Sequence, residues 1–116
     1  MLRTLCKSKI KQAFITDKVL HYNGSIGIDR SILESVDILP GEQVQVLNVN
    51  NAERFITYVI EEKADSGNIV LYGPAARKGE IGDELIILSF GIMDTKEALN
   101  FKMRQISLAK NNKCKN

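Results

Sequence analysis

Residues 42–62 read EQVQVLNVNNAERFITYVIEE, and this stretch decides the fold class. Apolar and polar side chains alternate over 42–49 and again over 54–62, which is the period of a β-strand with one buried face. The residues between the two runs, beginning with Asn50 and Asn51, are typical of a turn. The stretch therefore predicts a β-hairpin.

Further short strands flank this hairpin on both sides. β-Prone runs cover residues 13–22, with a break near Asp17, and then 25–29, 68–73 and 83–93. The last two runs are so apolar that we expect them to be buried on both faces. So many short strands in a small chain favour a mainly β fold closed into a barrel, because closure removes exposed edge strands.

Two short helices are expected between the strands. Over residues 29–39 apolar side chains recur at helical spacing, Asp29 can cap the first turn, and a Pro-Gly pair follows as a stop signal. Over residues 94–101, Asp94 and Glu97 have the spacing of a capping box. The chain is thus predicted to be a β protein with two small helices.

Composition and charge narrow the classes of function. The chain has 116 residues, enough for one domain, with a formal net charge of +2 and 44% hydrophobic residues. This balance does not argue for binding to nucleic acid or to a membrane, and no apolar run is long enough to span a bilayer. The charged N-terminus lacks the apolar core of a signal peptide, so we expect a cytoplasmic protein. The basic end of the chain, residues 109–116, is expected to fray and to be dispensable.

The usual catalytic and metal-binding sets are missing from the sequence. Cys6 and Cys114 lie near opposite termini and match neither a disulfide framework nor a metal site. His21 is the one histidine, and a lone histidine in a strand is more often structural than catalytic. No P-loop and no dinucleotide-binding glycine motif occurs. The pattern disfavours conventional cofactor enzymes and metal sites.

The segment LHYNGSIGID, residues 20–29, allows two interpretations. Asn23 and Gly24 suit the two positive-φ positions of a type I′ hairpin turn, and Ser25 then merely follows the turn. A Gly-Ser bond in a strained turn also permits a different chemistry. The hydroxyl of Ser25 can attack the carbonyl of Gly24, and elimination followed by hydrolysis would leave a pyruvoyl group, an electrophile that the chain makes from itself. On residue types alone the plain turn is the favoured interpretation, because Gly-Ser pairs are common and nearly all are inert.

A family resemblance favours the second interpretation. The segment HYNGS (21–25), followed at a matching distance by RFITY (54–58), resembles the bacterial pyruvoyl-dependent aspartate decarboxylases. The resemblance also covers LRT near the start, ILPGE, NVNNAERFITY and GDELIILSF, and it can be followed over roughly residues 1–95. It implies a double-psi β-barrel, a homotetramer, and decarboxylation of L-aspartate to β-alanine and CO2 for the synthesis of pantothenate and coenzyme A. It also implies a six-stranded catalytic barrel over 1–95, then a short helix or strand and a flexible basic tail over 96–116.

The resemblance assigns roles to residues of this chain. Ser25 becomes the pyruvoyl group, which forms a Schiff base with the substrate, and Gly24 is the end of the short chain left by self-cleavage. Tyr58 corresponds to the proton donor, and a phenol is able to return a proton after CO2 leaves. Arg54 corresponds to the residue that binds a substrate carboxylate, which suits its planar fork. Lys9 corresponds to a site lysine that adds positive charge.

The remaining substrate-binding positions implied by the resemblance are Thr57, the backbone of Gly73, Pro74 and Ala75, and Tyr22. The chain departs from the family at Tyr72, where an asparagine is common. A phenol donates one hydrogen bond but cannot replace an amide, so this change puts the rate of self-cleavage in question. No metal is implied.

Two questions stay open at this level. Strand alternation puts Arg54 and Tyr58 on one face and Thr57 on the other, so the three share a site only if the strand twists or if sites form between subunits. The sequence also leaves open whether self-cleavage is spontaneous or needs a maturation factor. The alternative function is a non-enzymatic small β-barrel that binds nucleic acid or a protein partner, with Asn23-Gly24-Ser25 as a plain turn and KNNKCKN (110–116) as a basic arm.

Overall fold

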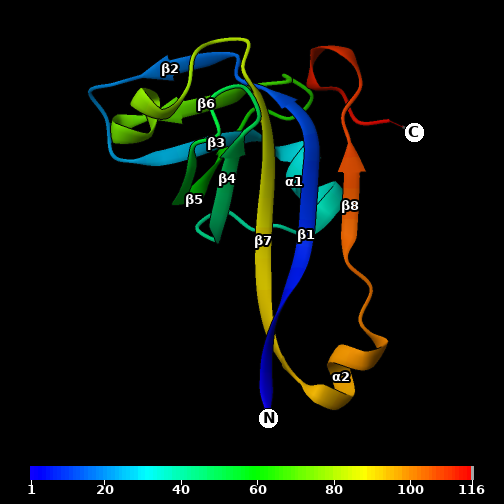
Figure 1. The fold of residues 1–116 in the computed structure, drawn as a ribbon. Coiled ribbons are helices and arrows are strands. Elements are labelled where there is room, and N and C mark those ends of the chain that lie inside the picture. Colours follow the sequence, from blue (N-terminus) through cyan, green and yellow to red (C-terminus); the bar gives the residue numbers. More distant parts are fainter. Residues whose placement is uncertain (116) are drawn as a thin grey trace.

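A computed structural model describes residues 1–115 as a long strand pair with a compact group of shorter strands at one end (Figure 1). In chain order the elements are β1 (Leu2–Phe14), β2 (Asp17–Val19), β3 (Ser25–Asp29), α1 (Arg30–Val36), β4 (Gln43–Asn48), β5 (Arg54–Glu62), β6 (Ile69–Tyr72), the 3-10 helix η1 (Gly73–Lys78), β7 (Glu84–Asp94), α2 (Thr95–Asn100), β8 (Arg104–Ser107) and the 3-10 helix η2 (Lys110–Asn112). The predicted mainly β fold with short helices is confirmed.

All the strands belong to one mixed sheet. Its order is β2-β6-β3-β5-β4-β7-β1-β8, and the parallel pairs are β1–β8, β2–β6 and β3–β5. The predicted hairpin is confirmed as β4 and β5, with Val44 opposite Thr57 and Val46 opposite Phe55. Residues 1–95 contain seven strands rather than the expected six, because residues 17–19 form a separate short strand on β6.

The core is aliphatic and lies on the inner face of this sheet. Its fully buried side chains include Ile10, Ile26, Ile28, Leu71 and Ile87. β6 is buried along most of its length, as expected, but the same expectation for β7 is wrong. In β7 the side chains alternate, so one face packs into the core and the other remains open.

The two helices begin where the capping residues predict. The side chain of Asp29 accepts a hydrogen bond from the Ser31 amide at 2.8 Å, and that of Asp94 accepts one from the Glu97 amide at 2.8 Å. Helix α1 ends at Asp37, whose φ of 57° is left-handed, before the proline and glycine are reached. Helix α1 thereby returns the chain from β3 to β4 and allows β3 to pair in parallel with β5.

The end of the chain packs against the barrel instead of fraying. β8 runs parallel to β1, and Leu108 is buried. The Asn112 side chain accepts a hydrogen bond from the Phe14 amide at 2.8 Å and donates to the carbonyls of Phe14 at 2.8 Å and Gly67 at 2.9 Å. The expectation that this end frays is therefore wrong around Asn112, whose side chain completes buried backbone hydrogen bonds of the barrel. That the tail is dispensable stays a prediction. Asn116 lies outside the described residues.

We expect Asn112→Ala to lower the free energy of unfolding by about 1–3 kcal/mol, because it leaves buried backbone groups without partners. Asn112 also has a φ of 55°, which asparagine tolerates better than alanine. Urea unfolding at fixed protein concentration measures the effect. The matched control is Asn100→Ala, since the exposed Asn100 amide bonds only within α2. Equal midpoints for the two variants would contradict this prediction.

Candidate active site

The bond between Gly24 and Ser25 joins an irregular loop to the first residue of β3. Ser25 is fully buried, and its Oγ donates one long hydrogen bond, of 3.5 Å, to the carbonyl of Asn23. The type I′ turn is not formed, because neither Asn23 nor Gly24 has a positive φ and β6 lies between β2 and β3. The loop before Ser25 is therefore shaped by other parts of the molecule.

Gly73 is the residue that shapes this loop. Its φ is +67°, and a Cβ built on it would lie 2.5 Å from the Tyr22 carbonyl oxygen and 2.8 Å from the Gly24 nitrogen. A side chain at position 73 would therefore displace the residues immediately before the Gly24–Ser25 bond. Pro74 approaches from the same element, with its Cδ 3.4 Å from a Cβ built on Gly24. η1 thus begins in direct contact with the bond that the sequence singles out.

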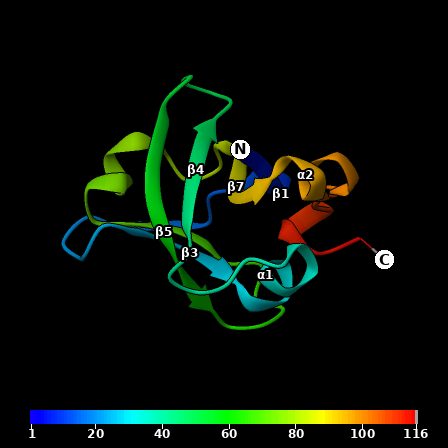
Figure 2. The same cartoon turned by 90° about the horizontal axis from the view of Figure 1, so that it is seen from below.

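A cavity of about 370 Å³ opens beside this bond. It is lined by Gly24, Phe55, Ile56, Thr57, Tyr58, Pro74, Ala75 and Lys78. Five of these residues were predicted from the sequence, while Phe55, Ile56 and Lys78 were not. Seen from below, η1 lies across β5 from β4, which leaves this part of β5 facing the helix (Figure 2).

Thr57 and Tyr58 share the cavity because β5 changes neighbours along its length. β3 pairs with β5 only from Ile26 opposite Val59 onward, so the segment before Val59 has an unpaired edge on that side. Along an unpaired edge, residues from both faces of a strand are accessible. Continuing the parallel register by one residue sets the backbone of Ser25 beside that of Tyr58, so the two residues are neighbours on adjacent strands.

Arg54 and Lys9 lie elsewhere in the single chain. The Arg54 Nη1 donates to the Gln45 Oε1 at 2.9 Å, and Arg54 lines a different cavity of about 300 Å³. Lys9 is on β1 opposite Leu88, which pairs in turn with Gln45 on β4. Both cations therefore lie on or beside the outward face of the sheet and not in the cavity beside Gly24.

Tyr72 faces Ser25 across the β3–β6 pair. Its hydroxyl donates to the Glu62 Oε2 at 2.8 Å, and its ring lies 4.8 Å from that of Tyr22. Burial, with a smaller effect of Glu62, raises the pKa of Tyr72 to about 12, so this phenol remains a hydrogen-bond donor at neutral pH. Tyr22 contacts Tyr72 and is largely exposed; it is not among the residues that line the cavity.

Sequence reasoning did not identify Glu62. A Cβ built on Gly27 would lie 2.3 Å from the Glu62 Oε2, so Gly27 leaves the space that this carboxylate occupies. A glycine inside an otherwise apolar strand was the available signal, because such a position often marks a close approach by another group.

The family model described as aspartate decarboxylase matches residues 1–115. The chain belongs to the aspartate decarboxylase family. The match continues past residue 95, where the resemblance based on motifs stopped.

Several relatives of this aspartate decarboxylase family member bear the name aspartate 1-decarboxylase. The protein from Thermoanaerobacter pseudethanolicus is 51% identical, covering 97% of this chain and 97% of its own. The protein from Coxiella burnetii is 54% identical over 86% of this chain and 91% of its own, and that from Ralstonia nicotianae is 40% identical over 99% and 96%. Among solved structures, the rationally designed mkDPBB_sym_86 protein aligns with a TM-score of 0.49 at 13% identity, covering 66% of this chain and 89% of its own.

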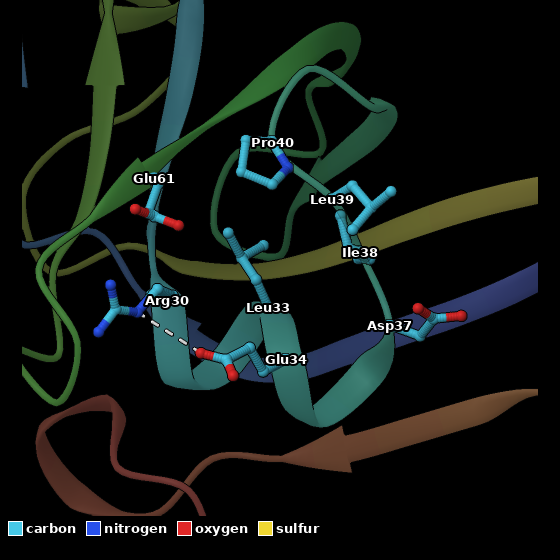
Figure 3. A pocket seen from close by; sticks show the side chains of 8 residues that line it. All are labelled: Arg30, Leu33, Glu34, Asp37, Ile38, Leu39, Pro40 and Glu61. Atoms are coloured by element: carbon cyan, nitrogen blue, oxygen red, sulfur yellow. Dashed lines mark ion pairs between the residues drawn. The ribbon is translucent and has the colours of Figure 1, made fainter.

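A second cavity of this family member is larger, at about 560 Å³, but has different chemistry (Figure 3). It lies between α1, the loop after it and Glu61 of β5, and it combines apolar side chains with the carboxylates of Glu34, Asp37 and Glu61. Among the described residues that line it, Arg30 is the one cation, and it is paired with Glu34 at 3.5 Å. An acidic rim repels a dicarboxylate substrate, and none of the predicted site residues lines this cavity. We therefore take the cavity beside Gly24 as the candidate active site.

Other site types find no support in the described part of the chain. Among residues 1–115 no group of three or more histidine, cysteine or acidic side chains is placed to hold a metal ion. Within the same residues, no helix has the length and apolar character needed to cross a membrane. His21 is exposed.

Proposed function

We propose that the chain is a pyruvoyl-dependent L-aspartate α-decarboxylase, which forms β-alanine and CO2 for pantothenate synthesis in the cytoplasm. The observation that carries the proposal is the position of the Gly24–Ser25 bond. It lies in a loop fixed by Gly73, at a cavity that Tyr58 also lines. Membership in the family and the names of the relatives support the choice of substrate.

The residues at this bond fit self-processing. The buried Ser25 hydroxyl has one long hydrogen bond, so little holds it away from the neighbouring Gly24 carbonyl. Attack on that carbonyl carbon converts the amide to an ester, and loss of the Gly24 carboxylate leaves dehydroalanine. Water then replaces the nitrogen, giving a pyruvoyl group at position 25 and ammonia. This group supplies an electrophilic carbonyl that binds an amino substrate and accepts the electrons of the broken bond.

The other residues of the cavity are proposed to bind the substrate and to return a proton to it. Tyr58 is proposed to deliver a proton to the substrate carbon from which CO2 has left. Thr57 and the backbone amides of Gly73 and Ala75 are proposed to donate hydrogen bonds to substrate oxygens. Pro74 has no N–H and donates no backbone hydrogen bond, so its place in this set rests on its position in the cavity.

We further propose that the active enzyme is a homotetramer whose subunits share sites. Arg54 and Lys9 lie outside the Gly24 cavity of their own chain, although an acidic substrate needs cations. Ile56 and Ile92 also lie on the outward face of this sheet and are 61% and 72% exposed. Burying that face against a second copy would remove apolar surface from water and bring Arg54 and Lys9 to a neighbour's cavity. Native mass spectrometry measures the subunit number directly.

Mass spectrometry together with an activity assay tests the proposed function. The purified protein should consist of chains 1–24 and 25–116, with the larger chain lacking a free amino group, and should convert L-aspartate to β-alanine. A single intact chain with no β-alanine formed, after prolonged incubation with cell extract to supply any maturation factor, would favour the non-enzymatic β-barrel.

Arg54→Lys should raise the KM for aspartate about tenfold or more while self-cleavage remains complete. The physical reason is that an ammonium cannot make the paired hydrogen bonds of a guanidinium, and a charge-assisted hydrogen bond is worth about 1.5–3 kcal/mol. Steady-state kinetics give the KM, and Arg30→Lys on α1, whose guanidinium pairs with Glu34, is the control. An unchanged KM would remove Arg54 from substrate binding.

A further inference from the structure

One charged side chain in the cavity beside Gly24 has no role so far. Among the described residues that line this cavity, Lys78 alone is charged. It is the last residue of η1, the helix whose first residue, Gly73, fixes the loop before Ser25. Lys78 therefore belongs to η1, the same short helix that positions the Gly24–Ser25 bond.

The backbone of Lys78 is held from two sides. Its carbonyl accepts hydrogen bonds from the Asn48 Nδ2 at 3.2 Å and from the Asn51 Nδ2 at 2.9 Å. Asn48 is buried, and its Nδ2 also donates to Asp83 at 2.9 Å. These contacts fix the point from which the Lys78 side chain extends, although the side chain itself can move.

The ammonium of Lys78 has an exchangeable partner. It lies 3.1 Å from the Glu53 Oε2, and both side chains are 44% exposed. Ion pairs as exposed as this contribute little free energy, so a substrate carboxylate can replace Glu53 at small cost. Glu53 also lines the cavity to which Arg54 belongs, so it borders both the Lys78 ammonium and that cavity.

We propose that Lys78 binds the carboxylate of the acidic substrate that remains in the product, and that Glu53 competes for the same ammonium. This inference rests on the proposed function. Lys78 suits the retained carboxylate because pairing with the departing one would stabilise the substrate more than the transition state, in which that charge disperses. Lys78 is thus a substrate-binding residue supplied by the same chain as the cavity.

Steady-state kinetics on fully self-cleaved enzyme test this inference. Lys78→Met should raise the KM for aspartate roughly three- to fivefold, the effect of losing a half-exposed charge pair, with little change in kcat. Lys78→Arg should preserve the KM. Glu53→Gln should lower it about twofold, because the ammonium is then free for the substrate. Added salt should reduce these differences.

The double variant separates this explanation from a general effect of charge. In the Lys78→Met background, Glu53→Gln should no longer change the KM. The control is Lys96→Met, which removes the same charge from an exposed position in α2, at the far end of the β1–β7 pair (Figure 1). It should leave the KM unchanged.

Several outcomes would overturn the inference. One is a wild-type KM in active Lys78→Met enzyme. Another is an undiminished effect of Glu53→Gln on the KM in the Lys78→Met background, which would mean that Glu53 acts on Arg54 and not on Lys78. Either result leaves the proposed function intact. Wild-type protein that neither cleaves nor decarboxylates aspartate would overturn the proposed function, and this inference with it. If Lys78→Met does not fold, as far-UV circular dichroism would show, Lys78→Arg and Glu53→Gln alone decide: a KM unchanged by Glu53→Gln then overturns the inference.

Discussion

Ser25→Ala should give one intact chain of 116 residues with no decarboxylase activity. The wild-type protein, by contrast, should consist of chains 1–24 and 25–116. The substitution removes the hydroxyl that attacks the Gly24 carbonyl, and no other atom of an alanine side chain can do so. The fold should survive, because the lost hydroxyl makes only one hydrogen bond, of 3.5 Å. Intact mass, circular dichroism and β-alanine formation measure the three parts of this result.

A matched control and a graded variant sharpen the Ser25→Ala experiment. Ser89→Ala removes another fully buried serine hydroxyl, from β7, and should leave cleavage and activity unchanged. Ser25→Cys keeps a nucleophilic atom on Cβ and should cleave slowly. Decarboxylase activity in Ser25→Ala, or in wild-type protein that remains wholly uncleaved, would show that the pyruvoyl mechanism is wrong.

Local sequence patterns predicted those parts of the fold that depend on neighbours in the chain. The alternation over 42–62 gave the β4–β5 hairpin, and Asp29 and Asp94 marked the starts of the two helices. Local patterns failed where contacts with distant segments of the chain determine the structure. The apolar composition of β7 indicated burial on both faces, yet its outward residues are open. Composition measures how apolar a strand is, but not whether the same chain or another copy covers it.

The loop before Ser25 shows the same limit. Asn23-Gly24 has the residue types of a type I′ turn, but β6 inserts between β2 and β3, so no hairpin can form there. The loop takes its shape from Gly73, about fifty residues later in the chain. At the other end of the chain, the polar residues around Asn112 resemble a frayed tail, although the Asn112 amide completes hydrogen bonds of Phe14 and Gly67. Both features depend on contacts that composition does not encode.

The candidate site was predictable in part. Gly24, Thr57, Tyr58, Pro74 and Ala75 were expected together and line one cavity. The position of Thr57 beside Tyr58 could not be deduced from alternation, because it depends on where β3 begins to pair with β5. Arg54 and Lys9 lie outside the cavity, and a single chain contains no information on which surface of a neighbour would meet them. Their roles stay predictions that rest on the homotetramer.

Tyr58→Phe should still self-cleave and still bind aspartate, but should lose about 10²–10⁴ in kcat, the usual contribution of a positioned general acid. Tyr58 lines the cavity, and the parallel register sets it beside Ser25. Phenylalanine keeps the ring that packs there and removes only the hydroxyl. Self-cleavage is the internal control, because it takes place at Ser25, the residue that later carries the pyruvoyl group, and needs the same local structure as decarboxylation. Intact mass measures cleavage, and steady-state kinetics on the cleaved variant measure kcat and KM separately.

A fully cleaved Tyr58→Phe enzyme with nearly wild-type kcat would mean that another group delivers the proton. A variant that fails to cleave would instead place the Tyr58 hydroxyl in the maturation step, where it would donate to the carbonyl oxygen of Gly24.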